Sequence, residues 1–437
     1  MLLRVIFENF LSFREPVQFD MFPNPKRTSH EHHIYSNEIP VLKMGAIYGA
    51  NGSGKSNLIK GLDFIHEFIS NNDFFKNNDV SAYIHKGDFD SPKSNLTSII
   101  EFESKGKYYI YSFTLSEERI VSEALFLSGK GIKDNVFIFK RDYDILTLQS
   151  KIDAKVKEAI DSLLSKNPTV SLLQLNEQFP IITDEDVEIA TNWLQNYLKI
   201  VPFNAVVVKL IDLMANNHRL LEFSKNILTE IGLGLSDINI KEELFDNWIK
   251  NKSHQHYSKI LSSEVQNDTV LGVTQDNRQI FIALKNNEET IVKEFVFSHL
   301  GKNGKVFELD INGESDGTVR LLNLIPALYG AIELGQTIVI DEIDHSIHPI
   351  LIFALIKLFA NSNTKGQLIF TTHETFLLNQ KVLLRADEVW FTEKIEGATK
   401  MYSLNDFKEH NTISLENGYI NGRYGAIPYI GDVEWLF

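Results

Sequence analysis

Hydrophobic and polar residues alternate with two different periods along this chain, and the changes of period divide it into segments. Residues 1–13 and 96–150 follow the two-residue period of half-buried strands, with polar turns between the runs. Residues 151–265 follow the helical period, and strand-like runs resume at 267–311. We therefore predict an antiparallel sheet over 96–150 and a compact helical insertion over 151–265.

Two apolar runs of strand length in the last third of the chain end in polar residues. Residues 337–340 lead into Asp341 and Glu342, and residues 367–372 lead into His373. Short continuous apolar runs are typical of strands buried in a parallel sheet, where ligands bind outside the carboxyl ends. We therefore predict an α/β fold with a site at that edge of the sheet.

A glycine-rich loop follows another apolar run and matches the phosphate-binding pattern G-x-x-x-x-G-K-[ST] in full. Its glycines let backbone N–H groups converge on phosphate oxygens, and Lys55 adds a positive charge for the β- and γ-phosphates. Ser56 offers a hydroxyl to Mg²⁺, and the helix that begins at Lys55 directs its positive end to the same anion. ATP and Mg²⁺ are thus the predicted cofactors. The predicted nucleotide-binding residues here are Gly49, Ala50, Asn51, Gly52, Ser53, Gly54, Lys55, Ser56 and Asn57.

Two adjacent carboxylates at a strand end repel each other unless a cation lies between them and the phosphates. Asp341 is therefore predicted to hold Mg²⁺ together with Ser56, and Glu342 to polarise the attacking water. His373 follows Asp341 by 32 positions (373 − 341), with one helical run between, which completes a βαβ unit. We expect His373 to reach the γ-phosphate beside Glu342. The predicted catalytic residues are Glu342, His373 and Lys55.

A polar loop with two glycines, GESDGTVRLL at 313–322, opens onto an apolar run as the start of a helix does. Together with the phosphate loop, Asp341, Glu342, Asp344 and His373, this loop resembles the motif set of ABC-type ATPases, and more closely that of their SMC-like and OLD-like branch. The opening ENFLSF and the closing GRYGAIP also resemble defence-associated members of that branch. The resemblance implies an ABC-type P-loop ATPase head with an antiparallel β-subdomain and a helical insertion.

In that family the signature loop of one head caps the γ-phosphate held by a second head, packed head-to-tail. The resemblance implies that Ser315, Asp316 and Gly317, at a helix start, contact the nucleotide of a partner copy. Asp344 would belong to the D-loop beside the same site. A homo-oligomer, at least a dimer, is therefore implied.

Three further residues are candidates by position in the family. Ser12 and Arg14 stand where related heads contact nucleotide from the first sheet, and Gln174 is a candidate for the Q-loop glutamine. The chain departs from the transporter pattern, which has a fuller LSGGQ signature. We expect ATPase lobe I with the phosphate loop and the antiparallel sheet over 1–150, the helical insertion over 151–265, and lobe II with the signature motif, the acidic pair and the switch histidine over 266–437.

Composition narrows the class of protein. The 437 residues exceed one ordinary core, and 43% hydrophobic with 23% charged residues is typical of a globular protein. Cysteine is absent from the sequence, which excludes disulfides and thiolate zinc sites. No apolar run approaches the roughly 20 residues that span a bilayer, and the first residues lack a signal-peptide pattern, so we expect a cytoplasmic protein. The net charge of −15 disfavours a dedicated nucleic-acid-binding protein.

Three histidines, His30, His32 and His33, lie in one polar stretch beside Glu31. A metal site and a solvated loop both fit this spacing. Because the sequence offers no second cluster of ligands, we favour the solvated loop.

The resemblance also implies a biological role. ATPase subunits of antiphage abortive-infection systems, such as AriA of PARIS and RloA-type proteins, resemble the chain most closely, and such a subunit controls a toxic effector. Only 64 residues follow His373 (437 − 373), fewer than a Toprim nuclease domain of ordinary size needs, so we expect a nuclease effector on a separate chain. Two alternatives stay open: an SMC-like DNA-repair or chromosome-maintenance ATPase, and a scaffold that binds ATP with little hydrolysis.

Overall fold

The chain folds into two compact units. The first comprises Met1–Pro202, Gly330–Ile343 and Leu355–Phe437, and the second comprises Phe203–Tyr329 and Asp344–Ala354. The computed structural model describes residues 1–87, 95–149, 153–203, 205–207, 209–250, 257, 270–276, 278–286, 289–379, 382–407 and 414–427.

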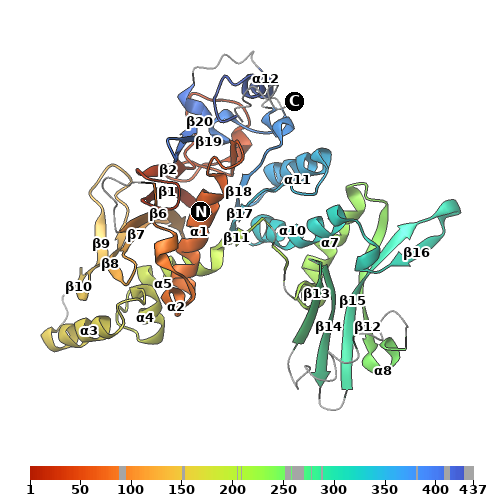
Figure 1. Ribbon diagram of the computed structural model, residues 1–437, viewed down its shortest axis with the longest axis horizontal. Coiled ribbons are helices and arrows are strands. Elements are labelled where there is room, and N and C mark those ends of the chain that lie inside the picture. Colours follow the sequence, from red (N-terminus) through yellow and green to blue (C-terminus); the bar gives the residue numbers. More distant parts are fainter. Residues whose placement is uncertain are drawn as a thin grey trace, which may run out of the picture. The chain divides into compact units, whose positions relative to one another are not determined.

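A six-stranded sheet in the first unit contains the apolar runs of the sequence (Figure 1). Five strands are parallel, and the last returns antiparallel to its neighbour. Every residue of the three central strands is buried, which explains their continuously apolar sequences. The prediction of a parallel sheet is confirmed. The order is β11 (Leu198–Val201), β17 (Thr337–Ile340), β18 (Gln367–Thr371), β5 (Met44–Gly49), β19 (Val389–Ile395) and β20 (Ala398–Ser403).

The register of this sheet aligns the carboxyl ends of three strands. Ile340, the last residue of β17, pairs with Phe370 of β18, which pairs with Ala46 of β5. The polar residues that follow each strand therefore leave the sheet at one edge.

The predicted antiparallel sheet is confirmed, and the N-terminal hairpin extends it to seven strands. Along β7, side chains alternate between buried and half-buried positions, as a sheet with one covered face requires. The order is β10 (Ile145–Leu148), β9 (Val136–Asp142), β8 (Ile120–Leu127), β7 (Lys107–Leu115), β6 (Leu96–Ser104), β1 (Leu2–Glu8) and β2 (Val17–Asp20).

The carboxamide of Gln367 joins these two sheets. Its Oε1 accepts a hydrogen bond from the Leu2 amide at 2.5 Å, and its Nε2 donates to the Leu2 carbonyl at 3.0 Å. The same Nε2 donates to the Leu42 carbonyl at 3.1 Å, and Oε1 also accepts from the Thr337 hydroxyl at 3.0 Å. Because Gln367 is completely buried, this fully bonded amide fixes how β1 meets β18.

Helix α1 (Lys55–Ser70) follows the phosphate loop and packs into the apolar core of the first unit. Its buried face includes Leu58, Leu62 and Ile65 at helical spacing. Gly61 lies against the ring of Phe7 on β1, and a Cβ atom at this glycine would be 2.5 Å from the ring. Only glycine at position 61 therefore allows the helix to approach β1 this closely.

The segment predicted to be a helical insertion contains helices and two strands among its described residues. Strand β11 is an edge of the parallel sheet, and β12 (Leu235–Leu244) belongs to a separate sheet of the second unit. Both were missed because the segment 198–201 is short and lies next to helical sequence, and because β12 carries many charged residues that dilute its alternation. The predicted boundaries at 150–151 and 265–266 lie outside the described residues. The helices are α3 (Ala154–Lys166), α4 (Leu172–Gln178), α5 (Glu185–Asn192), the π-turn Trp193–Tyr197, α6 (Leu210–Ala215), α7 (His218–Glu230) and α8 (Phe245–Trp248).

The second unit is built on an antiparallel sheet, which confirms the strands expected near 267–311. Figure 1 shows this sheet in green, with α7 and α8 beside it. Two long helices, α10 (Asp316–Glu333) and α11 (Pro349–Asn361), begin in this unit. The sheet order is β12, β15 (Glu289–Leu300), β14 (Arg278–Asn286) and β13 (Val270–Gln275), with β16 (Val306–Leu309) paired to β15.

Short elements complete the first unit. Pro428, the last residue of the closing motif GRYGAIP, lies outside the described residues. Within the motif, the Tyr424 carbonyl accepts a hydrogen bond at 2.7 Å from the hydroxyl of Tyr402 on β20. In the described part of the chain, no helix combines the length and apolarity that a membrane crossing requires. These elements are α2 (Phe74–Asn77), β3 (Ile34–Tyr35), β4 (Val41–Leu42) and α12 (Leu415–Ile420).

We predict that Gly61→Ala destabilises the first unit although alanine favours helix. The helix gains about 1 kcal/mol from the substitution, but overpacking against the Phe7 ring costs about 1–3 kcal/mol. Urea unfolding should therefore show a lower midpoint. The control is Lys60→Ala on the exposed face of the same helix, expected to change stability by less than about 0.5 kcal/mol. A Gly61→Ala chain as stable as the control would contradict the close contact.

Candidate functional site

The phosphate loop joins β5 to α1 in a conformation that requires its glycines. Gly54 has φ 110°, and a Cβ atom there would lie 2.2 Å from Oγ1 of Thr399. At Gly49 a Cβ atom would lie 2.4 Å from Oγ1 of Thr392. The loop is thus packed from behind by two threonines of β19 and β20, and its backbone is fixed as a phosphate cradle must be.

Lys55, the first residue of α1, is 5% exposed. Its Nζ donates to the Gly49 carbonyl at 2.9 Å and lies 2.9 Å from Nε2 of His373. The structure therefore brings together the predicted lysine and the predicted switch histidine, which are 318 positions apart (373 − 55). A phosphoryl group at the loop would have the ammonium and the imidazole beside each other.

Asp341 is anchored by two hydroxyl groups. Thr371 donates to its Oδ1 at 2.6 Å, and Ser56 donates to the same oxygen at 3.2 Å. The hydroxyl of Thr371 also accepts the Glu342 amide at 2.7 Å, so one threonine orients both acidic residues. A carboxylate beside a serine hydroxyl is the oxygen ligand set that Mg²⁺ prefers, and the residues present fit this ion.

Glu342 occupies a left-handed backbone conformation, with φ 47°. Such conformations are costly for residues other than glycine and are concentrated at functional sites. The strand β17 ends at Ile340, and the turn that follows places Glu342 in the lining of the cavity.

A cavity of about 480 Å³ lies above the phosphate loop, within the size range of small-molecule sites. Its lining combines two lysines, one carboxylate and small polar side chains. The lining residues are Ser12, Ala50, Asn51, Gly52, Gly54, Lys55, Ser56, Asn57, Glu342, His373 and Lys394.

Lys394 is a site residue that the sequence did not reveal. It follows Thr392 on β19, and Thr392 pairs with Gly49 at the start of the loop. Only the parallel pairing of β19 with β5 shows that Lys394 reaches the cavity. The feature of the sequence that could have identified Lys394 is its position just after the apolar residues of a strand.

Of the three candidates by family position, the structure brings only Ser12 to the cavity. Its hydroxyl accepts from Asn57 Nδ2 at 2.6 Å and lies 2.7 Å from Thr399 Oγ1. Arg14 lines a different cavity of about 800 Å³. Gln174 is buried and closes a capping box with Ser171 at the start of α4, so the Q-loop interpretation of Gln174 is wrong.

The predicted signature residues lie at the start of α10 in the second unit. Ser315 and Asp316 are exposed, and the Ser315 hydroxyl accepts the Thr318 amide at 3.1 Å as a helix cap does. Gly317 lies close to the segment after β17, since a Cβ atom there would be 3.1 Å from the Ser346 carbonyl. The half-buried Asp344 begins that segment, so the signature loop and the D-loop candidate are neighbours.

Arg278 of β14 holds the signature loop from the sheet. One guanidinium nitrogen donates to the carbonyls of Ile311 at 2.6 Å and Glu314 at 2.9 Å, and another pairs with Asp316 at 2.6 Å. The Glu314 side chain is in turn 2.6 Å from Nε2 of His299. Sequence reasoning missed Arg278 because this residue lies 35 positions (313 − 278) before the first residue of the loop.

Comparison with known proteins identifies a family. Residues 46–379 match the family described as "AAA domain, putative AbiEii toxin, Type IV TA system". No curated protein matches the chain.

Three similar solved structures are SMC heads. An SMC head bound to the C-winged helix domain of ScpA is 14% identical, with a TM-score of 0.48 over 93% of this chain and 99% of that chain. The SMC head domain from Thermotoga maritima is 13% identical, with a TM-score of 0.40 over 92% and 98%. An SMC head with an extended coiled coil, bound to the C-terminal domain of ScpA derived from Pyrococcus furiosus, is 13% identical, with a TM-score of 0.39 over 97% and 98%.

We predict that Arg278→Gln loosens the signature loop without unfolding the second unit. The shorter side chain cannot bridge both carbonyls, and the loss of a charged hydrogen bond costs about 1.5 kcal/mol or more. Amide hydrogen exchange over residues 311–319 should then be about tenfold faster. The matched control is Arg219→Gln on exposed α7. Equal exchange in the two variants would show that Arg278 does not hold the loop.

Proposed function

The chain belongs to the AAA-domain family that its residues 46–379 match, and from that premise we propose that it hydrolyses ATP as a subunit of an antiphage abortive-infection system. The observation that carries the proposal is the arrangement around Thr371. One hydroxyl orients Asp341 beside Ser56 and Glu342 beside the phosphate loop. That arrangement supplies a cation ligand and a base at the same end of the cavity.

The residues of the cavity suit a triphosphate. Backbone N–H groups of Gly52 to Lys55 and the start of α1 would bind the β- and γ-phosphates. Lys55 and Lys394 supply two positive charges against the single lining carboxylate, Glu342. A Mg²⁺ ion held by Ser56 and Asp341 would neutralise charge on the phosphate oxygens.

Glu342 would act on the attacking water. Its carboxylate accepts a proton as the water oxygen bonds to the γ-phosphorus, while the bond from that phosphorus to the bridging oxygen breaks and ADP leaves. His373 and Lys55 would hold the γ-phosphoryl oxygens on which negative charge lies during transfer. The left-handed backbone at Glu342 is of the strained kind that is concentrated at functional sites, and Glu342 lines the cavity.

A second copy of the chain would complete the site. Ser315, Asp316 and Gly317 leave exposed groups at the first turn of an 18-residue helix, where anions bind. The Ser315 hydroxyl and the backbone N–H groups around Gly317 would contact the γ-phosphate bound by the partner, and Asp316 and Asp344 of the same copy would lie beside that site. ATP would then hold a head-to-tail homodimer together, and hydrolysis would release it.

The proposed biological role rests on the resemblance of this chain to a protein family. The family description names a putative toxin of a type IV toxin–antitoxin system, which supports a role in controlling a toxic effector. We propose that the ATP-dependent assembly senses infection and holds or releases an effector on a separate chain, with a Toprim or other nuclease as the leading class. The net charge of −15 favours a protein over a nucleic acid as the main partner.

We predict that Glu342→Gln lowers ATP turnover by about 10²–10⁴-fold while ATP still binds, because only the base is lost. Turnover is measured as released phosphate, and binding by isothermal titration. Glu118→Gln in an exposed turn is the control and should match the wild type. Equal turnover of the Glu342→Gln and wild-type chains would rule out the mechanism and leave an ATP-binding scaffold.

A mixing experiment tests whether the site is shared between copies. Lys55→Ala and Ser315→Arg chains should each be inactive, but an equal mixture should regain about a quarter of the wild-type rate, since half the dimers hold one intact composite site. A mixture of Lys55→Ala and Glu342→Gln chains is the control, because both changes damage the phosphate-loop side and no intact site can form. If neither mixture regains activity, the proposal of a head-to-tail composite site is contradicted.

A further inference from the structure

Three histidine rings converge at the end of the loop between β2 and β3. His30, His32 and His33 each offer a ring nitrogen, and these nitrogens lie within 4.8 Å of one another. The ring centroids of His32 and His33 are 4.4 Å apart, and those of His30 and His33 are 5.1 Å apart. The prediction of a solvated loop fails for His33, which is only 1% exposed, whereas His32 is exposed.

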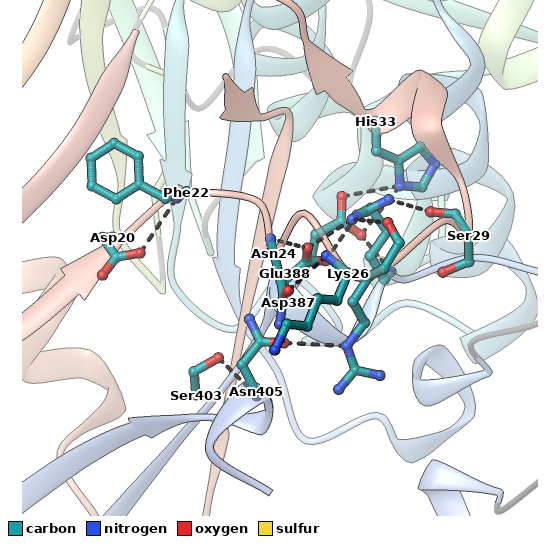
Figure 2. Close-up of polar contacts among 12 residues, drawn as sticks. Asp20, Phe22, Asn24, Lys26, Ser29, His33, Asp387, Glu388, Ser403 and Asn405 are labelled. Carbon is teal, nitrogen blue, oxygen red and sulfur yellow. Dashed lines mark hydrogen bonds and ion pairs between the residues drawn. The ribbon is translucent and has the colours of Figure 1, made fainter. Parts of the chain in front are cut away.

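His33 is oriented by a buried carboxylate. Its Nδ1 lies 3.0 Å and 3.2 Å from the two carboxylate oxygens of Glu388, which is completely buried. Figure 2 shows this contact, with Glu388 and His33 facing each other from distant parts of the chain. Metal-bound histidines typically donate their second ring nitrogen to such a carboxylate, which fixes the ring and its tautomer. With Nδ1 held by Glu388, Nε2 is the ligand atom of His33.

The loop that carries the histidines is anchored by the turn that carries Glu388. Arg385 forms a bidentate pair with Asp387 at 2.8 Å for both contacts, and it donates to the carbonyls of Ser29 and Arg27. Asp387 also accepts the Asn24 amide at 2.7 Å. Figure 2 shows this network around Asp387 and Ser29. The backbone under the three rings is thus fixed before any ligand arrives.

We propose that His30, His32 and His33 bind a divalent transition-metal ion, with Glu388 as the residue that positions His33. Three imidazoles suit Zn²⁺, Co²⁺ or Ni²⁺, whereas Mg²⁺ and Ca²⁺ require oxygen ligands. A water molecule would take the remaining tetrahedral position. The site is separate from the nucleotide cavity, whose lining contains none of these three histidines.

Metal binding requires the ring nitrogens of His30 and His32 to move slightly closer to His33. Zn–N bonds of about 2.0–2.1 Å place the nitrogens of a tetrahedral site about 3.4 Å apart. His32 is exposed and His30 is half-buried, so both rings can turn toward the fixed His33. The turn itself is already closed, since the His33 amide donates to the His30 carbonyl at 2.9 Å.

The charges around the site allow a cation. Arg385 is neutralised by its pair with Asp387. Lys43 opposes the ion, but its Nζ donates to the Ser362 carbonyl at 3.1 Å and lies over the Tyr35 ring. The ion would tie the loop after β2 to the turn before β19 and so add stability to the start of that strand.

The test uses the full chain without an affinity tag, stripped with a chelator and then titrated with Co²⁺. We expect one Co²⁺ per chain, with the visible absorption of tetrahedral coordination, displacement by Zn²⁺, and a rise in the unfolding temperature on Zn²⁺ addition. His30→Ala and His32→Ala should each weaken binding by at least tenfold, and Glu388→Gln by about 10–100-fold.

His218→Ala, which removes an exposed histidine at the start of α7, is the matched control and should bind like the wild type. The proposal is overturned by the absence of stoichiometric Co²⁺ uptake, or by uptake that survives in both the His30→Ala and His32→Ala chains. These two residues are not completely buried, so their variants are expected to fold, and circular dichroism before titration checks this. None of the readouts depends on ATP turnover.

Discussion

Parallel register among β17, β18 and β5 is the constraint on which the chemistry of this chain depends. Pairing Ile340 with Phe370 and Phe370 with Ala46 brings three strand ends to one edge. A shift of one residue would reverse the side-chain faces of a strand and displace its end from those of its neighbours. The same pairing puts the Thr371 hydroxyl between the carboxylate of Asp341 and the amide after it. The burial that stabilises the sheet therefore also sets the geometry of the acidic residues.

Features that depend on local pattern could be predicted from the sequence. The phosphate loop, β17 with its acidic pair and β18 with His373 each occupy a short, self-contained stretch, and strands β6 to β10 of the antiparallel sheet follow one another along the chain. Residues whose role depends on non-local pairing could not be predicted in this way. Lys394 reaches the cavity only because β19 pairs with β5, and Arg278 reaches the signature loop across a sheet. The burial of His33 could not be predicted because its partner Glu388 is 355 positions (388 − 33) away.

An acidic protein can bind an anion because the repulsion from its net charge and the attraction from the charges at the site act over different distances. The net charge of −15 is spread over the whole surface, and salt screens it beyond about 8 Å at physiological ionic strength. Lys55 and Lys394 lie at the cavity itself, together with the N-terminus of α1. Their short-range attraction therefore outweighs the distant repulsion. The surface charge would slow the arrival of a nucleotide more than it would weaken its binding.

Both neighbours of β5 come from the far end of the chain. Strand β18 begins 318 residues (367 − 49) after β5 ends, and β19 follows it. On the ribosome, the strand that leads into the phosphate loop therefore emerges long before either of its hydrogen-bonding partners has been synthesised. Its fully apolar sequence and open edges would be available to other chains during that interval. Helix α1, made immediately afterwards, can cover one face of the nascent strand, but the edges must wait or be shielded by a chaperone.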